Sequence, residues 1–337
     1  MSTKVAINGF GRIGRLVFRR AIIEQDLEIV AINAAYSSEI LAHLIQYDSN
    51  HGKFAGEVIP KEDHLIVNGK KILLLNRRNP IELPWEELNV EIVIEATGKF
   101  NSKEDAMMHI KAGAQKVILT APGKNVDVTI VMGVNDHCYD PDKHVIISNA
   151  SCTTNCLAPV VKVIDQQFGI ENGFMTTVHS YTNDQRIIDN PHKDLRRARS
   201  CAQSIIPTTT GAAKALGLVL PKLKGKLDGL ALRVPTPNVS LVDLVIDVER
   251  DATVDEVNEA LQKASQNELN GILDFSTEPL VSIDYNSNPH SAIVDGLSTM
   301  VMDKRKVKVL AWYDNEWGYS CRVVDLAKVV AEKMRER

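Results

Sequence analysis

A chain of 337 residues with a formal net charge of −4 carries no electrostatic sign of nucleic-acid binding or of attachment to a membrane surface. Hydrophobic residues make up 44% of the sequence and charged residues 24%, a balance typical of a globular protein with a large core. No run approaches the roughly 18 consecutive apolar residues of a membrane span, and the length predicts two domains.

The cysteines and the start of the chain predict a cytoplasmic protein. Five cysteines are an odd and sparse set for this length, which favours reduced thiols and a cytosolic setting. The chain enters a strand-like run at Lys4–Ile7 with no signal peptide before it. The sequons that begin at Asn149 and Asn238 are then chance matches.

The first 150 residues alternate apolar strands with helical patterns, which predicts an α/β domain with a parallel sheet. A first helix follows Gly11, because Ile13 and Val17 fall on one helical face. A second is capped by Ser102 and ends at Gly113. The strands predicted in this half are Val5–Asn8, Glu28–Asn33, Glu91–Ala96, Lys116–Thr120, Thr129–Val134 and Val145–Ser148.

Beyond residue 150 the pattern changes to long alternating strands with fewer helices. Strands are predicted at Gly229–Pro235, Val239–Val248 and Lys306–Tyr313, with a helix at Val254–Gln266. This half therefore predicts an α+β domain with a largely antiparallel or mixed sheet. The last segment, Ser320–Arg337, has a helical pattern.

A glycine-rich turn follows the first predicted strand and opens the first helix. The sequence Asn8-Gly9-Phe10-Gly11-Arg12-Ile13-Gly14 contains Gly-x-Gly-x-x-Gly. Such glycines allow a tight turn and a close approach of the backbone to a pyrophosphate, and the helix N-terminus offers free N–H groups to the phosphates. In a βαβ context the motif predicts a Rossmann dinucleotide-binding domain, whereas alone it would fit a purely structural turn.

The second predicted strand lacks the acidic residue that selects NAD. An Asp or Glu at its end would bind the ribose 2′-hydroxyl, but the chain reads Asn33-Ala34-Ala35-Tyr36 there. Without that carboxylate a 2′-phosphate meets no repulsion, so we expect NADP to be preferred over NAD. Arg78 is the expected positive partner, and Arg77 beside it is an equally good candidate; both also fit solvated surface charges.

Cys152 is the candidate nucleophile. It lies between a predicted strand and a predicted helix, and a thiol at a helix N-terminus has its thiolate stabilised by the dipole and the free N–H groups. Cys156 follows one turn deeper on the same face, so a disulfide or a metal pair are alternatives, although further ligands at zinc spacing are not evident and no metal is expected. Pro159 should bend the helix slightly.

His179 is the best-placed base among nine histidines. It ends Phe174–Val178, a predicted strand that would deliver it to a domain edge. A histidine at a strand end can equally be structural.

Taken together, these residues resemble the glyceraldehyde-3-phosphate dehydrogenase family, phosphorylating type, over the whole length of the chain. Besides the glycine-rich turn, five motifs carry the resemblance in order and spacing. They are Ala150–Pro159 (ASCTTNCLAP), Val178–Thr182 (VHSYT), Pro207–Lys214 (PTTTGAAK), Arg233–Ser240 (RVPTPNVS) and Trp312–Ser320 (WYDNEWGYS), with Arg196–Arg199 (RRAR) between the second and third.

The resemblance implies a role for each matching position. Cys152 would be the nucleophile and His179 its base and acid. The pocket for attacking inorganic phosphate would be formed by Ser151, Thr153, Arg197, Thr210 and Gly211, and the substrate's own phosphate would be held by Thr182 and Arg233. The cofactor would be bound by Asn8, Gly9, Gly11, Arg12, Ile13, Gly14, Asn33, Arg78, Thr97, Thr120 and Asn315.

The resemblance also implies an architecture and partners. A cofactor domain would comprise residues 1–150 completed by a C-terminal helix at 316–337, and a catalytic domain would comprise 151–315. The family is a homotetramer that interconverts glyceraldehyde 3-phosphate and 1,3-bisphosphoglycerate with inorganic phosphate and NAD or NADP, in glycolysis or gluconeogenesis. Arginines suit two phosphate subsites, because a guanidinium binds phosphate through two parallel hydrogen bonds.

Two departures from NAD-specific members favour NADP. Such members usually carry Asp where this chain has Ala34, and an apolar residue where it has Asn190 before Pro191. Both changes make the adenosine pocket less hostile to a 2′-phosphate.

Three other functions fit parts of the pattern. An erythrose-4-phosphate dehydrogenase uses the same scaffold, although such relatives tend to lose the Thr210-Gly211 loop that is present here. A binding protein on an inactive scaffold is disfavoured by the intact Cys152 and His179. A zinc or redox module would be built on Cys152 and Cys156.

Overall fold

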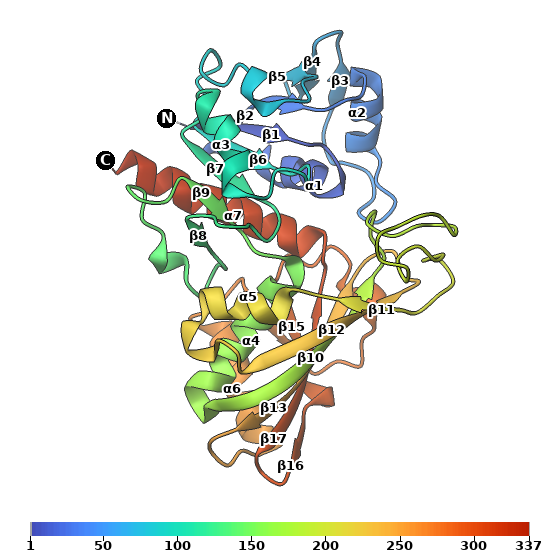
Figure 1. Cartoon of the computed structure of the whole chain (residues 1–337), viewed down its shortest axis with the longest axis vertical. Coiled ribbons are helices and arrows are strands. Elements are labelled where there is room, and N and C mark those ends of the chain that lie inside the picture. Colours follow the sequence, from blue (N-terminus) through green and yellow to red (C-terminus); the bar gives the residue numbers. More distant parts are fainter. Residues whose placement is uncertain (1, 337) are drawn as a thin grey trace. The chain divides into compact units, whose positions relative to one another are not determined.

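The computed structural model describes residues 2–336; residues 1 and 337, which end the two predicted ranges of the cofactor domain, lie outside the described residues. The chain divides into two compact units (Figure 1). The first unit comprises residues 2–130, 136–150 and 320–336, and the second 131–135 and 151–319. Compared with the predicted ranges, residues 131–135 and 316–319 group with the second unit.

The first unit is built on a nine-stranded sheet with the order β3-β4-β5-β2-β1-β6-β7-β9-β8. All neighbouring pairs are parallel except the antiparallel β3–β4 and β4–β5 pairs. Its strands are β1 (Thr3–Asn8), β2 (Leu27–Asn33), β3 (Val58–Pro60), β4 (His64–Val67), β5 (Lys70–Leu75), β6 (Ile92–Glu95), β7 (Lys116–Leu119), β8 (Val128–Thr129) and β9 (Ile146–Ser148). Its helices are α1 (Arg12–Ala21), α2 (Ser38–Gln46) and α3 (Lys103–Lys111), with short 3-10 turns at Pro80–Glu82 and Asp136–Cys138.

The central strands are apolar on both faces, as expected for a parallel sheet covered by helices. Every residue of β6 is buried, and in β1 every residue except Lys4 is buried. Helix α1 buries Leu16 and Val17 on its inward face. The parallel sheet predicted for this half is confirmed, whereas the hairpin strands β3 to β5 and helix α2 were not predicted.

One strand prediction is wrong. Thr129–Val134 was expected to be extended, but β8 stops at Thr129 and residues 132–135 form a turn. Gly133 has a positive φ of 76°, and the Asn135 side chain accepts a hydrogen bond from the Val131 N–H at 2.8 Å. This local bond competes with strand pairing in a run that is apolar enough to resemble a strand.

The second unit has an eight-stranded mixed sheet with the order β11-β12-β10-β13-β17-β15-β14, and β16 pairs with β17. The β10–β12 and β14–β15 pairs are parallel and the others antiparallel, which confirms the predicted mixed sheet. The strands are β10 (Ile170–Ser180), β11 (Ile206–Thr209), β12 (Leu227–Val234), β13 (Ser240–Val248), β14 (Leu273–Ser276), β15 (Ala292–Asp295), β16 (Met300–Met302) and β17 (Lys306–Tyr313). The helices are α4 (Cys152–Phe168), α5 (Ala212–Val219) and α6 (Val254–Gln266), with 3-10 turns at Pro221–Leu223, Ser282–Tyr285 and Gly296–Ser298.

Strand β13 shows why this sheet carries helices on one face. Its residues alternate strictly between buried and partly exposed, which is the period of a half-covered antiparallel sheet. Helix α4 contacts β10, β13, β15 and β17 and supplies the cover (Figure 1). The first residue of α4 therefore lies beside the sheet, where strand ends can reach it.

The last helix, α7 (Trp317–Arg335), begins three residues earlier than the predicted Ser320. The Asp314 carboxylate accepts hydrogen bonds from the N–H groups of Glu316 and Trp317 and so supplies the cap. Within residues 2–336, every helix is too short or too polar to span a bilayer.

Candidate active site

Cys152 is the first residue of α4, so its thiol lies at the helix N-terminus. Ser151 caps this end, because its hydroxyl accepts a hydrogen bond from the Thr154 N–H at 3.0 Å. First-turn amides have no acceptor within a helix, and together with the helix dipole they favour a negative charge at this end. The position suits both a thiolate and an oxyanion on a bound carbonyl.

His179, near the end of β10, faces this thiol. The Cys152 Sγ lies 3.6 Å from His179 Nε2. The other ring nitrogen, Nδ1, lies 2.7 Å from the Ser180 carbonyl oxygen. Because a carbonyl only accepts, Nδ1 carries the proton and Nε2 presents its lone pair to the thiol. The structure thus holds the imidazole in the tautomer of a general base.

Burial keeps both groups neutral at rest. It raises the pKa of the Cys152 thiol, against the opposing charge of Arg233 and hydrogen bonds from Thr153. Burial also lowers the pKa of His179 to about 3, with the positive charge of Arg233 acting in the same direction. The proton on the Cys152 Sγ therefore has an acceptor in His179 Nε2, and its transfer to that nitrogen activates the sulfur.

Tyr313 links Thr153 and Thr177 beside the catalytic pair, and it was not predicted as a site residue. Its buried hydroxyl lies 2.9 Å from the hydroxyls of both Thr153 and Thr177. Its ring meets that of His179 edge-on, with the centroids 6.0 Å apart. Thr153 is thus held by a residue 160 positions away in sequence, a pairing that no local pattern indicates.

Arg233 brings a positive charge beside the base. Strands β10 and β12 are parallel, and His179 and Arg233 are directly paired across them. The Arg233 Nη1 donates to the Ser180 carbonyl and to the Thr182 hydroxyl, both at 3.1 Å, while its buried Nε has no partner. No carboxylate among residues 2–336 forms an ion pair with Arg233, so its charge remains open to an anion.

Arg197 is already occupied by protein groups. Its Nη1 donates to the Asp184 carboxylate, its Nε to the Thr208 hydroxyl at 2.9 Å, and its Nη2 to the Thr209 carbonyl at 3.1 Å. Asp184 is half-exposed, so the ion pair is open to competition from an incoming anion. Asp184 was not among the predicted site residues.

Thr210 and Gly211 immediately follow the Thr209 carbonyl that Arg197 contacts. The Thr210 hydroxyl accepts a hydrogen bond from the Ala212 N–H at 3.2 Å, and Gly211 is the N-cap of α5 without a side-chain cap. A side chain at Gly211 would meet nothing within 4 Å. Gly211 is thus exposed, with open space beside it for a ligand.

Asn315 is fixed by two hydroxyl groups. Those of Ser180 and Ser240 each donate to its Oδ1 at 2.9 Å. The amide orientation is thereby set, and its NH2 group faces away from both serines. A fixed amide donor of this kind suits a carboxamide ligand.

In the first unit, the glycine-rich turn has the features that a pyrophosphate requires. A Cβ atom at position 14 would lie 2.2 Å from the Gly9 carbonyl oxygen, so only glycine allows α1 to pack this closely against the turn. Gly9 has a φ of 92°. Gly11 is exposed with nothing within 4 Å of a Cβ position, and the first turn of α1, which includes the partly buried Ile13, carries no acid. These residues fit the phosphates of a dinucleotide.

Arg12, a predicted cofactor-binding residue, is the first residue of α1. Its guanidinium binds Asp48 through two hydrogen bonds of 2.6 and 3.1 Å. The backbone of Arg12 remains at the start of α1, but its charge is matched within the protein.

The remaining predicted cofactor residues lie at the carboxyl ends of the parallel strands. Asn8 and Asn33 end β1 and β2. Thr97 and Thr120 are held by Glu95, the former through its side chain and the latter through its carbonyl. Arg78 is exposed beyond β5. Strand carboxyl ends form the ligand-binding edge of such sheets.

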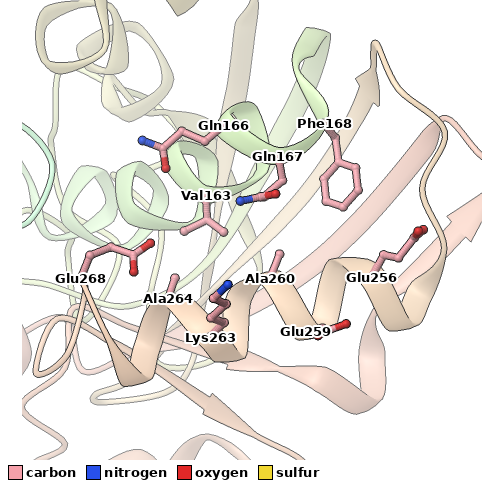
Figure 2. A pocket seen from close by; sticks show the side chains of 10 residues that line it. All are labelled: Val163, Gln166, Gln167, Phe168, Glu256, Glu259, Ala260, Lys263, Ala264 and Glu268. Carbon is pink, nitrogen blue, oxygen red and sulfur yellow. The ribbon is translucent and has the colours of Figure 1, made fainter.

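A groove lies far from this chemistry. Figure 2 shows it between the carboxyl half of α4, from Val163 to Phe168, and helix α6. At 1.5 Å per residue, Val163 lies roughly 16 Å along the helix from Cys152. All five cysteines are free, and residues 2–336 contain no group of three or more side chains placed to hold a metal ion.

Comparisons with known proteins cover nearly the whole chain. Residues 3–103 match the sequence model described as glyceraldehyde 3-phosphate dehydrogenase, NAD binding domain, and residues 151–315 match its C-terminal domain. A glyceraldehyde-3-phosphate dehydrogenase 2 of Bacillus subtilis is 71% identical over 335 residues, covering 99% of this chain and 98% of the relative. The glyceraldehyde-3-phosphate dehydrogenase of Geobacillus stearothermophilus is 62% identical, covering 99% of each chain, and that of Priestia megaterium 58%, also covering 99% of each.

Proposed function

Because the chain belongs to the glyceraldehyde-3-phosphate dehydrogenase family of oxidoreductases, we propose that it is the phosphorylating enzyme, working through a thioester on Cys152. It interconverts glyceraldehyde 3-phosphate and 1,3-bisphosphoglycerate. The observation that carries this proposal is the Cys152 thiol at a helix N-terminus, 3.6 Å from an imidazole nitrogen that bears no proton.

The reaction begins with proton transfer from the Cys152 Sγ to His179 Nε2. The thiolate then bonds to the aldehyde carbon, and the imidazolium returns the proton to the carbonyl oxygen to give a hemithioacetal. First-turn amides of α4 stabilise the negative charge on that oxygen.

His179 next removes the hydroxyl proton while a hydride leaves the same carbon, which yields the thioester. The hydride acceptor would be a nicotinamide dinucleotide. The glycine-rich turn would hold the phosphates of that cofactor, and Asn315 would bind its carboxamide. Inorganic phosphate then attacks the thioester carbon, and Cys152 leaves as the thiolate.

Two sets of residues serve the two phosphates. Arg233 and Thr182 hold the phosphate of the substrate. The Arg233 guanidinium has no carboxylate partner among the described residues, and its hydrogen bond to the Thr182 hydroxyl keeps the two side chains together. Ser151, Thr153, Arg197, Thr210 and Gly211 receive inorganic phosphate, which must displace Asp184 from Arg197. We also propose that the protein is a cytoplasmic homotetramer.

Initial rates with two aldehydes test the substrate. Oxidation of glyceraldehyde 3-phosphate should require inorganic phosphate for turnover, because the thioester is otherwise released only by water. Erythrose 4-phosphate should react more slowly under the same conditions. Rapid turnover of erythrose 4-phosphate without phosphate would instead identify an erythrose-4-phosphate dehydrogenase.

We further propose that NADP is preferred over NAD, which favours the reductive direction. Support comes from Ala34, directly after β2, where an acid would repel a 2′-phosphate, and from Arg77 and Arg78 beyond the end of the neighbouring β5. Ala34 is itself bonded to β5, through its N–H to the Leu75 carbonyl at 2.9 Å.

Ala34→Asp should therefore weaken NADP use. A carboxylate about 4 Å from a 2′-phosphate costs roughly 2 kcal/mol, between the aqueous and near-surface limits, so kcat/KM for NADP should fall about 10- to 100-fold while that for NAD holds or rises. Ala34→Asn is the control, because it adds the same volume without charge. A wild-type enzyme that uses NAD as well as NADP would overturn the preference.

A further inference from the structure

A chain of buried side chains crosses the interior of the first unit and ends beside the adenosine end of the proposed cofactor site. It runs from Trp85 through His109, Glu95 and Asn8 to Asn33, and each member is less than one-tenth exposed. We call these five residues the buried relay. Its members come from α3, the ends of β1, β2 and β6, and the loop after the first 3-10 turn (Figure 1).

The first two members fix the direction of the hydrogen bonds. The indole Nε1 of Trp85 lies 3.0 Å from His109 Nδ1, and an indole only donates. His109 therefore accepts at Nδ1 and carries its proton on Nε2, which donates to the Glu95 Oε2 at 3.0 Å.

Glu95 is the acceptor at the centre of the relay. Its Oε2 also accepts from Asn8 Nδ2 at 2.5 Å, and its Oε1 accepts from the N–H and hydroxyl of Thr97. A carboxylate has only acceptors, so Asn8 must turn its NH2 group toward Glu95 and its Oδ1 away.

Asn33 is the last member of the relay and forms hydrogen bonds to the backbone of Arg77, in the loop after β5. Its Nδ2 donates to Asn8 Oδ1 at 2.7 Å and to the Arg77 carbonyl at 2.8 Å, and its Oδ1 accepts from the Arg77 N–H at 2.9 Å. Turning the Asn33 amide over would set acceptor against acceptor at Asn8 Oδ1 and at the Arg77 carbonyl, and donor against donor at the Arg77 N–H. The hydrogen bonds that run from Trp85 to Asn8 and the two bonds to the Arg77 peptide thus require the same orientation of the Asn33 amide.

We propose that the buried relay positions the Arg77 peptide, and with it the exposed guanidinium groups of Arg77 and Arg78, for recognition of a 2′-phosphate. Trp85, His109 and Glu95 then act as positioning residues for cofactor preference without touching the cofactor. This inference rests on the proposed dinucleotide site. A relay that served the core alone would support both dinucleotides equally, since they differ only at the 2′ position.

Calorimetric binding of NADP and NAD to the purified protein, without aldehyde, tests the relay. The quantity compared is the ratio of Kd for NAD to Kd for NADP, each variant relative to wild type. Asn33→Leu should lower this ratio about tenfold, because Arg77 loses both bonds. Asn8→Leu, which is similar in volume, and His109→Leu should lower it several-fold in the same direction.

Two variants serve as controls. His109→Gln should restore the wild-type ratio, because its amide can accept from Trp85 and donate to Glu95. Asn135→Leu repeats the asparagine change in the second unit and should leave the ratio unchanged. Circular dichroism establishes that each variant is folded; if His109→Leu is not, Asn8→Leu decides.

The outcomes separate the relay from the cofactor preference. The wild-type ratio alone tests whether NADP is preferred, whereas the change in ratio tests the relay whichever dinucleotide the wild type binds better. Equal loss of affinity for both dinucleotides in Asn8→Leu and Asn33→Leu would overturn the relay. A ratio that falls in Asn33→Leu but stays at the wild-type value in Asn8→Leu and His109→Leu would overturn it too.

Discussion

Cys152→Ser should abolish aldehyde oxidation, lowering kcat/KM by about 10⁴-fold or more. A serine hydroxyl at this helix N-terminus has the same place as the thiol but ionises far less readily, and it is a poorer leaving group when phosphate attacks. Steady-state rates with glyceraldehyde 3-phosphate and phosphate measure the loss. Because serine is similar in size to cysteine and the position is at the helix start, the fold should be unaffected.

Cys156→Ser is the matched control. The same atom is exchanged one turn deeper in α4, where the thiol donates to the Ala311 carbonyl and a hydroxyl can do so too. Burial raises the pKa of Cys156 well above its ordinary value, so it is not a competing nucleophile. Activity that survives in Cys152→Ser but disappears in Cys156→Ser would transfer the reaction to the other cysteine.

His179→Asn should slow turnover by about 10²- to 10⁴-fold, the range for loss of a general base. The thioester should still form slowly, because the thiol remains in place. A single-turnover experiment that follows reduced cofactor and acyl-enzyme together distinguishes a slow step from an absent one. Unchanged kcat would show that His179 is structural.

The same variant should change the pH dependence of Cys152 alkylation by iodoacetamide. Burial raises the pKa of the thiol above the ordinary value for a cysteine, so without an imidazole to take the proton the thiolate forms only at alkaline pH. In the wild type, transfer to His179 supports reaction at lower pH. Superimposable pH profiles of the two proteins would exclude proton transfer between Cys152 and His179.

Much of the fold could be predicted from periodicity, because long strands and amphipathic helices bury their apolar faces with a regular spacing. The mixed sheet of the second unit and helix α6 are examples. Thr129–Val134 failed because a positive φ at Gly133 and a side-chain bond from Asn135 break an apolar run. The hairpin β3 to β5 has short strands with little periodic signal.

The fold brings two of the predicted site residues together, whereas several of their contacts were not predicted. Cys152 and His179 stood out by local context and by resemblance, and the fold brings them to hydrogen-bonding distance. Tyr313 contacts Thr153 across 160 positions of sequence, which no local pattern can show. Asp184 lies 13 positions from Arg197, in a loop without periodic pattern. Glu95 did leave a signal, as an acid that ends the otherwise apolar run Ile92-Val93-Ile94.

The direct pairing of His179 with Arg233 across β10 and β12 has a consequence for substrate length. Neighbouring strands lie about 4.8 Å apart, and their separation is set by backbone hydrogen bonds rather than by loops. In the roles proposed for His179 and Arg233, the reacting carbon and the terminal anion of an aldehyde would therefore have to match a fixed span. We therefore expect an aldehyde with one more carbon to bend in order to reach both groups, so the spacing of the two strands would favour the three-carbon sugar.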